Sequence, residues 1–274
     1  MSIWSCPVCG GDMERRERSL VCSKGHMFDY ARSGYVNLLP VNRKRTKDPG
    51  DNALMVQARR SFLNAGYYKP LCDRLCGVLV PLSPAQGVLL DAGCGEGYYT
   101  KNAAEALAQS GKQMEVYGVD IAKCAVDAAA RSCKSAGFAV GSVFHLPVKD
   151  ESCDVLMSLF APYCGGEFQR VLKPEGKMVL VIPGEMHLMG LKQAIYDKPY
   201  ANEVQDYALE GFRFLGAERV EAEIFLENSE DIRSLFSMTP YYYKTGREEH
   251  RRLEELEELR TQISFEILQY EKEV

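Results

Sequence analysis

The stretch VLLDAGCGEGYYT, residues 88–100, carries three glycines within five positions, directly after a short apolar run and an aspartate. Glycine permits positive φ angles and lets a ligand approach the main chain closely. The run VLLD is typical of a buried strand that ends at Asp91, and a helix is expected to begin near Tyr98. The loop at residues 93–97 between them therefore predicts a ligand site at the end of a strand.

The charge beside this loop indicates which ligand it binds. Dinucleotide sites use the spacing G-x-G-x-x-G, with a pyrophosphate at the N-terminus of the helix. Here the spacing is D-x-G-x-G-x-G, and a carboxylate at Asp91 is unfavourable beside a pyrophosphate. The carboxylate suits the amino group of a zwitterionic ligand with a positive sulfur, such as S-adenosylmethionine. A domain that binds another nucleotide, or none, is the alternative at this point.

Apolar runs and helix-like stretches alternate from residue 87 to about residue 183. The runs are VLLDAG, MEVYGVD, CDVLMSLF and KMVLVIP. This alternation predicts right-handed β-α-β units, hence an α/β fold with a doubly wound, mostly parallel sheet and helices on both faces. Residues 211–236 are expected to add one or two strands. The charged stretch from Glu248 is expected to form a solvent-exposed helix.

Polar and aromatic residues follow the later strands. The run VYGVD ends in Asp120, 23 residues after Gly97, where a carboxylate can accept hydrogen bonds from both ribose hydroxyls of a nucleoside. Backbone groups near His145 are placed to contact an adenine edge. Phe160 and Tyr163 come after the next strand, and each is either a stacking platform for a base or a core side chain.

Two short pairs of possible metal ligands lie near the N-terminus. Cys6 and Cys9 form a C-x2-C pair, and Cys22 and His26 form a C-x3-H pair 12 residues further on. Thiolate and imidazole ligands at this spacing suit the tetrahedral geometry of structural zinc. We therefore expect one structural Zn²⁺ that holds residues 1–36 together. A pair of disulfides, or free thiols, is the alternative.

The net charge of −5 conceals a basic N-terminal portion. Residues 1–60 hold 11 Lys and Arg against 6 Asp and Glu, whereas the remainder holds 22 against 32. A polyanion would be contacted from the basic side, and chance clustering is the alternative. No apolar run approaches the ~20 residues of a membrane span, and the N-terminus lacks a secretory pattern. We therefore expect a protein of the reducing cytoplasm that does not bind a membrane.

Four motifs occur in order over residues 87–183: the D-x-G-x-G-x-G loop, the aspartate after the second strand, LP-x-x-D-x-x-x-D and RVLKPEG. Together they resemble the class I S-adenosylmethionine-dependent methyltransferases, although Ser142 stands where many of these carry an acidic residue. The resemblance implies a Rossmann-like sheet of seven strands. With the arguments above, it also implies the following cofactor-binding residues: Tyr68, Asp91, Gly93, Gly95, Glu96, Gly97, Tyr98, Asp120, Ile121, His145, Leu146 and His187.

Further phrases narrow the resemblance and extend it over nearly the whole chain. They are FDYARSGYVNLL at 28–39, RKRTKDPGDNALMVQARRSFLNAGYY at 43–68, PGEMHLMGLK at 183–192 and MTP at 238–240. With the zinc pairs, they resemble the 23S ribosomal RNA guanine-N1 methyltransferases. The resemblance implies a zinc-binding domain at residues 1–36 that helps to grip an rRNA hairpin. It also implies a linker with helices at 37–86, a methyltransferase domain at 87–274, and a homodimer.

Contacts to the RNA are expected from two groups of residues. Arg43, Lys44 and Arg45 can contact phosphates, although a basic cluster of this kind also occurs in solvated linkers. RNA is mostly recognised through splayed bases stacked on aromatic side chains, for which Phe160 and Tyr163 are candidates. Guanine N1 carries a proton at neutral pH, so a base must accept it. Glu167, Glu185 and His187 are candidates, and the sequence does not choose among them.

Two other functions compete with this interpretation. A small-molecule methyltransferase that acts on quinones or lipids would explain the RVLKPEG region, but it leaves the zinc ligands and the basic cluster unexplained. A non-catalytic zinc RNA-binding protein would explain those two features. The intact glycine loop, with Asp91 and Asp120 beside it, argues against a protein that has lost its cofactor.

Overall fold

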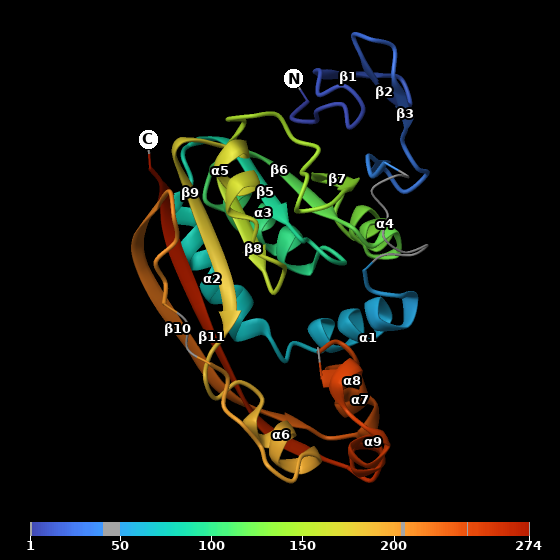
Figure 1. Ribbon diagram of the computed structural model, residues 1–274, viewed down its shortest axis with the longest axis vertical. Coiled ribbons are helices and arrows are strands. Elements are labelled where there is room, and N and C mark those ends of the chain that lie inside the picture. Colours follow the sequence, from blue (N-terminus) through green and yellow to red (C-terminus); the bar gives the residue numbers. More distant parts are fainter. Residues whose placement is uncertain (1, 41–49, 204–205, 240, 274) are drawn as a thin grey trace.

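The protein was analysed as a computed structural model that describes residues 2–40, 50–203, 206–239 and 241–273. A large sheet with helices on both faces forms the body (Figure 1). The small strands of the N-terminal segment lie at one end, and α6, α7, α8 and α9 lie at the other. Within the described residues, no helix has both the length and the apolar character needed to cross a membrane.

The N-terminal segment contains a three-stranded antiparallel sheet in the order β1-β2-β3. Its strands are Met13–Arg16, Ser19–Cys22 and Met27–Asp29. This segment packs against the large sheet through Trp4, whose ring meets that of Tyr117 edge-on at 5.3 Å between centroids. The main chain of Ser5 donates to the carbonyl of Pro147 at 3.0 Å. The small domain is therefore fixed to the body and is not merely tethered to it.

The large sheet has the strand order β10-β11-β9-β8-β5-β6-β7-β4. Its strands are β4 Val36–Asn37, β5 Gln86–Ala92, β6 Gln113–Asp120, β7 Ala136–Val140, β8 Cys153–Leu159, β9 Leu172–Pro183, β10 Phe212–Leu226 and β11 Leu259–Lys272. All neighbours are parallel except the pairs that β11 makes with β9 and β10. The prediction of a mostly parallel, doubly wound sheet is confirmed.

The large sheet has one strand more than the seven that the resemblance implied. Within the described residues the large sheet has eight strands, because β4 from the N-terminal segment adds to the edge strand β7. Val36 is fully buried there, so this two-residue strand is held by packing as well as by its main-chain bonds. The eighth strand thus comes from the stretch expected to lead out of the zinc-binding domain.

The C-terminal region also differs from the expectation. The helix expected from Glu248 is only α9, Arg247–Glu254, and the chain then forms the long strand β11. Leu259, Thr261 and Ile263 are buried whereas residues 260 and 262 are exposed, which is the alternation of a strand and not the period of a helix. Residues 211–236 give one strand, β10, followed by the helix α7, Ser229–Ser237.

Helices pack against the sheet and contribute side chains to the hydrophobic core. They are α1 Ala53–Asn64, α2 Lys69–Leu82, α3 Tyr98–Gln109, α4 Lys123–Ser132, α5 Gly165–Val171, α6 Met189–Ile195, α7, α8 Tyr241–Lys244 and α9. Leu89 and Leu90, neighbours on β5, belong to different core clusters: the first packs with α2 and α3, and the second with α5 and the N-terminal segment. This alternation is that of a strand buried on both faces.

The connections from β5 place a ligand site at its carboxyl end. β5 pairs with β6 on one side and with β8 on the other. The chain leaves β5 through α3 toward β6 and later crosses to β8, so the strand order reverses at this point. Ligands of open α/β sheets bind outside the carboxyl ends of the strands at such a switch point. The glycine loop lies there.

Candidate functional site

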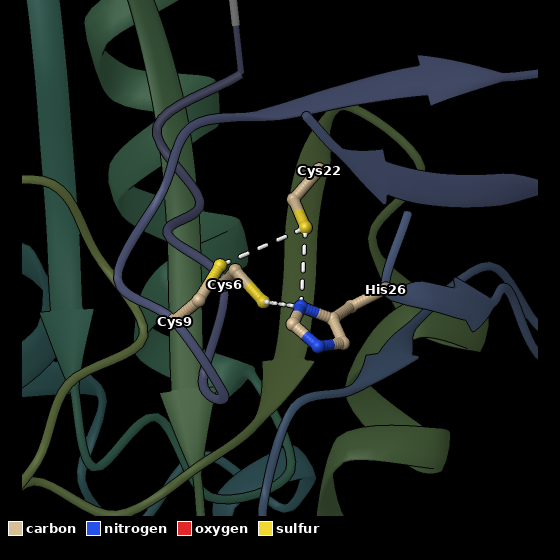
Figure 2. Close-up of side chains that lie close together, drawn as sticks. All are labelled: Cys6, Cys9, Cys22 and His26. Carbon is tan, nitrogen blue, oxygen red and sulfur yellow. Dashed lines mark hydrogen bonds between the residues drawn. The ribbon is translucent and has the colours of Figure 1, made fainter. Parts of the chain in front are cut away.

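The predicted zinc ligands converge in the N-terminal segment (Figure 2). Ligand atoms of Cys6, Cys9, Cys22 and His26 all lie within 4.8 Å of one another. The Sγ atoms of Cys9 and Cys22 are 3.7 Å apart, and Nδ1 of His26 is 3.3 Å from Sγ of Cys22 and 3.5 Å from Sγ of Cys6. Ligands about 2.0–2.3 Å from a tetrahedral ion are about 3.3–3.8 Å apart, so the four atoms fit one zinc ion.

Glycines let the chain turn at both ligand pairs. Gly10 donates its N–H to the carbonyl of Cys6 with φ of 71°, and Gly25 donates to the carbonyl of Cys22 with φ of 82°. A residue with a side chain is disfavoured at these angles. Because the protein supplies four ligands, the ion has no position left for a reacting water, and the zinc is structural.

The glycine loop follows β5 as predicted and approaches its neighbours too closely for side chains. A Cβ on Gly93 would lie 2.4 Å from Cβ of Ala161, and a Cβ on Gly97 would lie 2.7 Å from Cβ of Ala129. Both glycines have positive φ, 95° and 85°. The loop is therefore fixed by steric fit to the start of the segment after β8 and to α4.

Asp91 lies at the start of this loop with half of its carboxylate unsatisfied. Thr100 donates to Oδ2 of Asp91 at 2.6 Å, whereas Oδ1 is buried and has no hydrogen-bond partner among the described residues. Burial raises the pKa of Asp91 to about 7, although the bond from Thr100 opposes this rise. An orphaned carboxylate oxygen at this position fits a ligand that brings a cationic donor.

Asp120, at the end of β6, holds the other side of the loop. Its Oδ2 accepts the N–H of Gly95 at 3.0 Å, and its Oδ1 accepts the N–H of Ala122 at 2.8 Å. Burial raises the pKa of Asp120, and these two bonds oppose the rise. Each carboxylate oxygen has two lone pairs, so both can still accept a hydroxyl of a bound ribose. Ile121, which follows Asp120, is partly buried beside it.

Tyr68 and His187 meet near the carboxyl ends of β8 and β9, although 119 residues separate them. Tyr68 Oη lies 3.4 Å from Nε2 of His187. The backbone N–H of Ser264 donates to Nδ1 of His187 at 3.3 Å, so the proton of the neutral ring is on Nε2. Burial, with the cation of Lys192 nearby, lowers the pKa of His187 to about 3. The ring is therefore neutral at physiological pH.

Phe160 lies beside this pair and is held in an unusual backbone conformation. Its ring is 5.5 Å from that of Phe265, which also packs against Tyr68 and His187. Phe160 has φ of 56°, an outlier for a bulky residue, and 49% of the residue is exposed. Backbone strain of this kind clusters at functional sites. Tyr163 is also exposed, and its ring packs edge-on against Phe168.

Two main-chain donors of the loop at residues 142–147 already have partners within the protein. The N–H of His145 donates to the carbonyl of Ser142 at 3.0 Å, and the N–H of Leu146 donates to Oε2 of Glu167 at 2.7 Å. Glu167 also pairs with Arg170 through both carboxylate oxygens. Although burial acts in the opposite direction, this pairing lowers the pKa of Glu167. Glu167 is therefore an ionised structural residue, which argues against its candidacy as the base.

The remaining predicted residues are Glu96, Tyr98 and Glu185, and the basic cluster Arg43, Lys44 and Arg45. Glu96 is buried and Tyr98 partly buried at the start of α3, and Glu185 is exposed on the turn after β9. Arg43, Lys44 and Arg45 lie outside the described residues. Leu38, Leu39 and Pro40, which precede them, line a groove of about 610 Å³ that also borders Cys6, His145 and Arg170.

Two residues at the site were not identified from the sequence. Asp51 and Arg59 form an ion pair beside the glycine loop. A Cβ on Gly95 would lie 3.7 Å from Nη1 of Arg59. Both residues belong to the phrase at 43–68, which was used only for its likeness to a family. The Asp and Arg flank the start of a helix at a spacing of eight residues, which is too common a pattern to indicate a function.

Comparisons with known proteins agree with this geometry. Residues 4–47 match the zinc-ribbon family described as RlmA, N-terminal, and residues 85–235 match the methyltransferase domain family. A 23S rRNA (guanine(748)-N(1))-methyltransferase of Streptomyces fradiae is 36% identical over 69% of this chain and 66% of its own length. The Bacillus subtilis (strain 168) protein YxjB, named for the same guanine-N1 class, is 30% identical over 97% of this chain and 96% of its own. The chain belongs to the 23S rRNA (guanine-N1) methyltransferase family.

The chain is thus a guanine-N1 methyltransferase family member with an N-terminal zinc ribbon and an S-adenosylmethionine-dependent methyltransferase domain. The solved structure of YcgJ from Bacillus subtilis has a TM-score of 0.47 and 16% identity, and covers 73% of this chain and 98% of that one.

Proposed function

We propose that the protein transfers the methyl group of S-adenosylmethionine to N1 of a guanine in a hairpin of 23S rRNA. The observation that carries this proposal is the occurrence of two intact sites in one chain of this family: the four-ligand zinc cluster and the glycine loop with its strand-end carboxylates. A small-molecule methyltransferase requires only the second site. The family's named relatives support the substrate.

The cofactor is assigned to the crevice at the carboxyl ends of β5 and β6. The orphaned Oδ1 of Asp91 suits the amino group of its methionine part, and Asp120 suits the ribose hydroxyls. Gly93, Gly95 and Gly97 allow the close approach, and the start of α3 at Glu96 and Tyr98 borders it. Ile121, His145 and Leu146 would enclose the adenine. When bound, S-adenosylmethionine supplies an electrophilic methyl on a cationic sulfur.

Tyr68 and His187 are assigned to the carboxylate end of the cofactor. His187 points its Nε2–H toward Tyr68, and the hydroxyl of Tyr68 can then donate its own proton to a ligand. Since His187 is neutral, this pair offers hydrogen bonds and no full charge. The pair therefore orients the cofactor. Asp91 balances the charge of the amino group at the other side of the methionine part.

The target guanine is assigned to the face beside Phe160. An exposed aromatic ring in a fixed backbone suits stacking of a base that has left its helix. Tyr163, exposed on the same segment, is the second platform, and Arg43, Lys44 and Arg45 are the proposed phosphate contacts. Much of the catalysis is then positioning of N1, methyl and sulfur in line.

The base that accepts the N1 proton is narrowed by the geometry. Glu167 is held by Arg170, and Nδ1 of His187 accepts a main-chain N–H. Of the three candidates, Glu185 is the exposed one, and we propose it as the base. Replacement by Gln tests it: loss of the acidic limb of the pH–rate profile supports the role, and an unchanged profile excludes it.

Methyl transfer to unmodified 23S rRNA, followed by mapping of reverse-transcription stops, tests the proposed function. Methylation at N1 blocks base pairing, so a new stop at one guanine is expected with wild-type protein. Transfer to a small acceptor without a stop would contradict the proposal. We also propose a homodimer and a cytoplasmic enzyme, in keeping with an rRNA substrate. Sedimentation of the full chain tests the dimer.

A further inference from the structure

Residues 50–52 and α1 pack against the segment that follows β6 and against α4. Gly50 packs so closely on the segment after β6 that a Cβ there would lie 2.9 Å from both Cγ2 of Ile121 and Cβ of Ala122. The thiol of Cys124 donates to the carbonyl of Asp51 at 3.3 Å. Val56 continues the contact, because it packs with Ala122 and the rest of the start of α4. Residues 50–52 therefore cover the end of β6, where Asp120 ends the strand.

The guanidinium of Arg59 connects residues 50–52 to the glycine loop and to the C-terminal helices. Arg59 pairs with Asp51, lies beside Gly95, and reaches the carbonyl of Met238 at the end of α7 with its Nη2 at 3.5 Å. Helices α1 and α7 pack against each other, which brings these groups together (Figure 1). The side chains of Arg59 and Asp51 are only 29% and 24% exposed, so solvent screens the pair less than it screens a surface ion pair.

The charges around the loop explain why a cation is needed at this point. Three carboxylates lie around the loop, those of Asp51, Asp120 and Glu96. The charge of Asp51 acts to raise the pKa of Asp120, whereas the charge of Arg59 acts to lower the pKa of both Asp120 and Glu96. Like charges at close range favour protonation, and a protonated Asp120 loses part of its capacity to accept hydrogen bonds. Burial raises the pKa of Asp120, and the charge of Arg59 adds to the main-chain bonds from Ala122 and Gly95 that oppose this rise.

We propose that Arg59, through its pair with Asp51, is a positioning residue for the cofactor that holds residues 50–52 and the Gly95 turn around the ribose. The proposal rests on the proposed function, since it takes the crevice as the cofactor site. Arg59 acts through the carboxylates that it neutralises and the segment that it fixes. It does not act on the methyl group or on the target base.

The test measures binding of S-adenosylmethionine and of its demethylated product, S-adenosylhomocysteine, to the full zinc-loaded chain by titration calorimetry. Arg59→Gln is expected to raise both Kd values by the same factor, about 10- to 100-fold, the range for losing hydrogen bonds to a charged group. The factor is common because both ligands carry the same ribose. With saturating cofactor, kcat for rRNA methylation should stay within about threefold of wild type. The weaker binding should therefore appear as a higher KM for S-adenosylmethionine.

The matched control is Arg252→Gln. Arg252 also joins a carboxylate, Asp197, to a main-chain carbonyl, that of Ile195, and its side chain is 33% exposed. It lies on α9, so its loss should leave both Kd values within about twofold of wild type. Asp51→Asn should weaken binding as Arg59→Gln does, and the double variant should cost no more than either single change, because the two residues act as a unit. Arg59→Lys should restore part of the affinity.

Three results separate the possibilities. If Arg59→Gln leaves both Kd values within twofold, the positioning role is wrong while the proposed function stands. If the variant binds S-adenosylmethionine more tightly relative to the product, which lacks the sulfonium charge, Arg59 acts only as a repelling charge, and the proposal is also overturned. If wild-type protein binds neither ligand, the assignment of the crevice fails, and the proposed function fails with it.

Discussion

The backbone N–H of Ser5 donates to the carbonyl of Pro147 at 3.0 Å, and this bond joins the zinc ribbon to the loop that carries His145 and Leu146. A second bond, from the N–H of Lys149 to the carbonyl of Ile3, lies beside it. The first zinc ligand, Cys6, directly follows Ser5. Main-chain hydrogen bonds therefore link the segment that carries the metal site directly to the proposed adenine pocket.

Zinc removal should consequently affect both sites. We expect Cys22→Ser, or treatment with a chelator, to unfold residues 2–30 and to weaken RNA binding strongly, because such small domains depend on the ion for their fold. Cofactor affinity should fall by a few-fold only, since Asp91, Asp120 and the glycine loop stay in place. Calorimetry and RNA gel shifts measure the two losses. Strong cofactor loss with intact RNA binding would reverse these roles.

Asp91 should make stability and cofactor binding depend on pH. Its pKa rises from 3.8 to about 7 on folding, so the folded state holds a proton that the unfolded state has released. Stability from this group is present below about pH 4 and is lost as pH rises through 7, by about 4 kcal/mol at most. Urea unfolding of the ligand-free protein between pH 4 and pH 8 measures this loss, and Asp91→Asn should remove it.

The same residue should release a proton when the cofactor binds. An ammonium group favours the ionised carboxylate, so binding at pH 6 should displace a proton from Asp91 into the buffer. Calorimetry in two buffers with different ionisation enthalpies counts that proton. Wild type and Asp91→Asn should then differ by close to one proton. Equal counts for the two proteins would show that the ammonium group lies elsewhere.

Phe160→Leu should reduce methylation through the RNA and not through the cofactor. Base–aromatic stacking contributes ~1–3 kcal/mol, so kcat/KM for rRNA is expected to fall about 5- to 150-fold. The Kd for S-adenosylmethionine should change by less than about twofold. Phe214→Leu, which removes an exposed ring from β10, serves as the control and should leave both values intact. A higher Kd for S-adenosylmethionine in Phe160→Leu would show that the ring contacts the cofactor and not the RNA.

Glu167→Gln distinguishes a structural residue from a base. The substitution weakens the bonds to Arg170 and to the N–H of Leu146, so the melting temperature should fall and the Kd for the cofactor should rise about tenfold. At saturating cofactor, kcat should be nearly unchanged across pH 6 to 9. A kcat lowered by several hundredfold, with normal melting, would instead identify Glu167 as the proton acceptor.

Much of the fold was predictable because local patterns determine it. The alternation of apolar runs with helical stretches predicted β5, β6, β8 and β9, and the four zinc ligands were readable from their spacing alone. β11 was missed because its charged residues resemble those of the preceding helix α9. Burial of Glu266 beside Arg219 shows that a charge can face inward when it is paired, which a pattern of apolar residues does not reveal.

The site was less predictable wherever it depends on contacts between distant segments. Asp91 and Asp120 follow strands, so the sequence located them. The role of Glu167 depends on Arg170 and on a main-chain N–H 21 residues away, and its pairing became visible only in three dimensions. Arg59 illustrates the same limit, because its partners Asp51 and Met238 lie 8 and 179 residues from it.

The two-residue strand β4 bears on how the protein responds to loss of zinc. It covers the outer edge of β7, and the chain reaches it directly from the zinc ribbon. An uncovered parallel edge strand offers free main-chain groups to any neighbouring molecule. Metal-depleted protein should thus tend to self-associate through that bare edge, and light scattering during chelation should rise while the rest of the sheet is still folded.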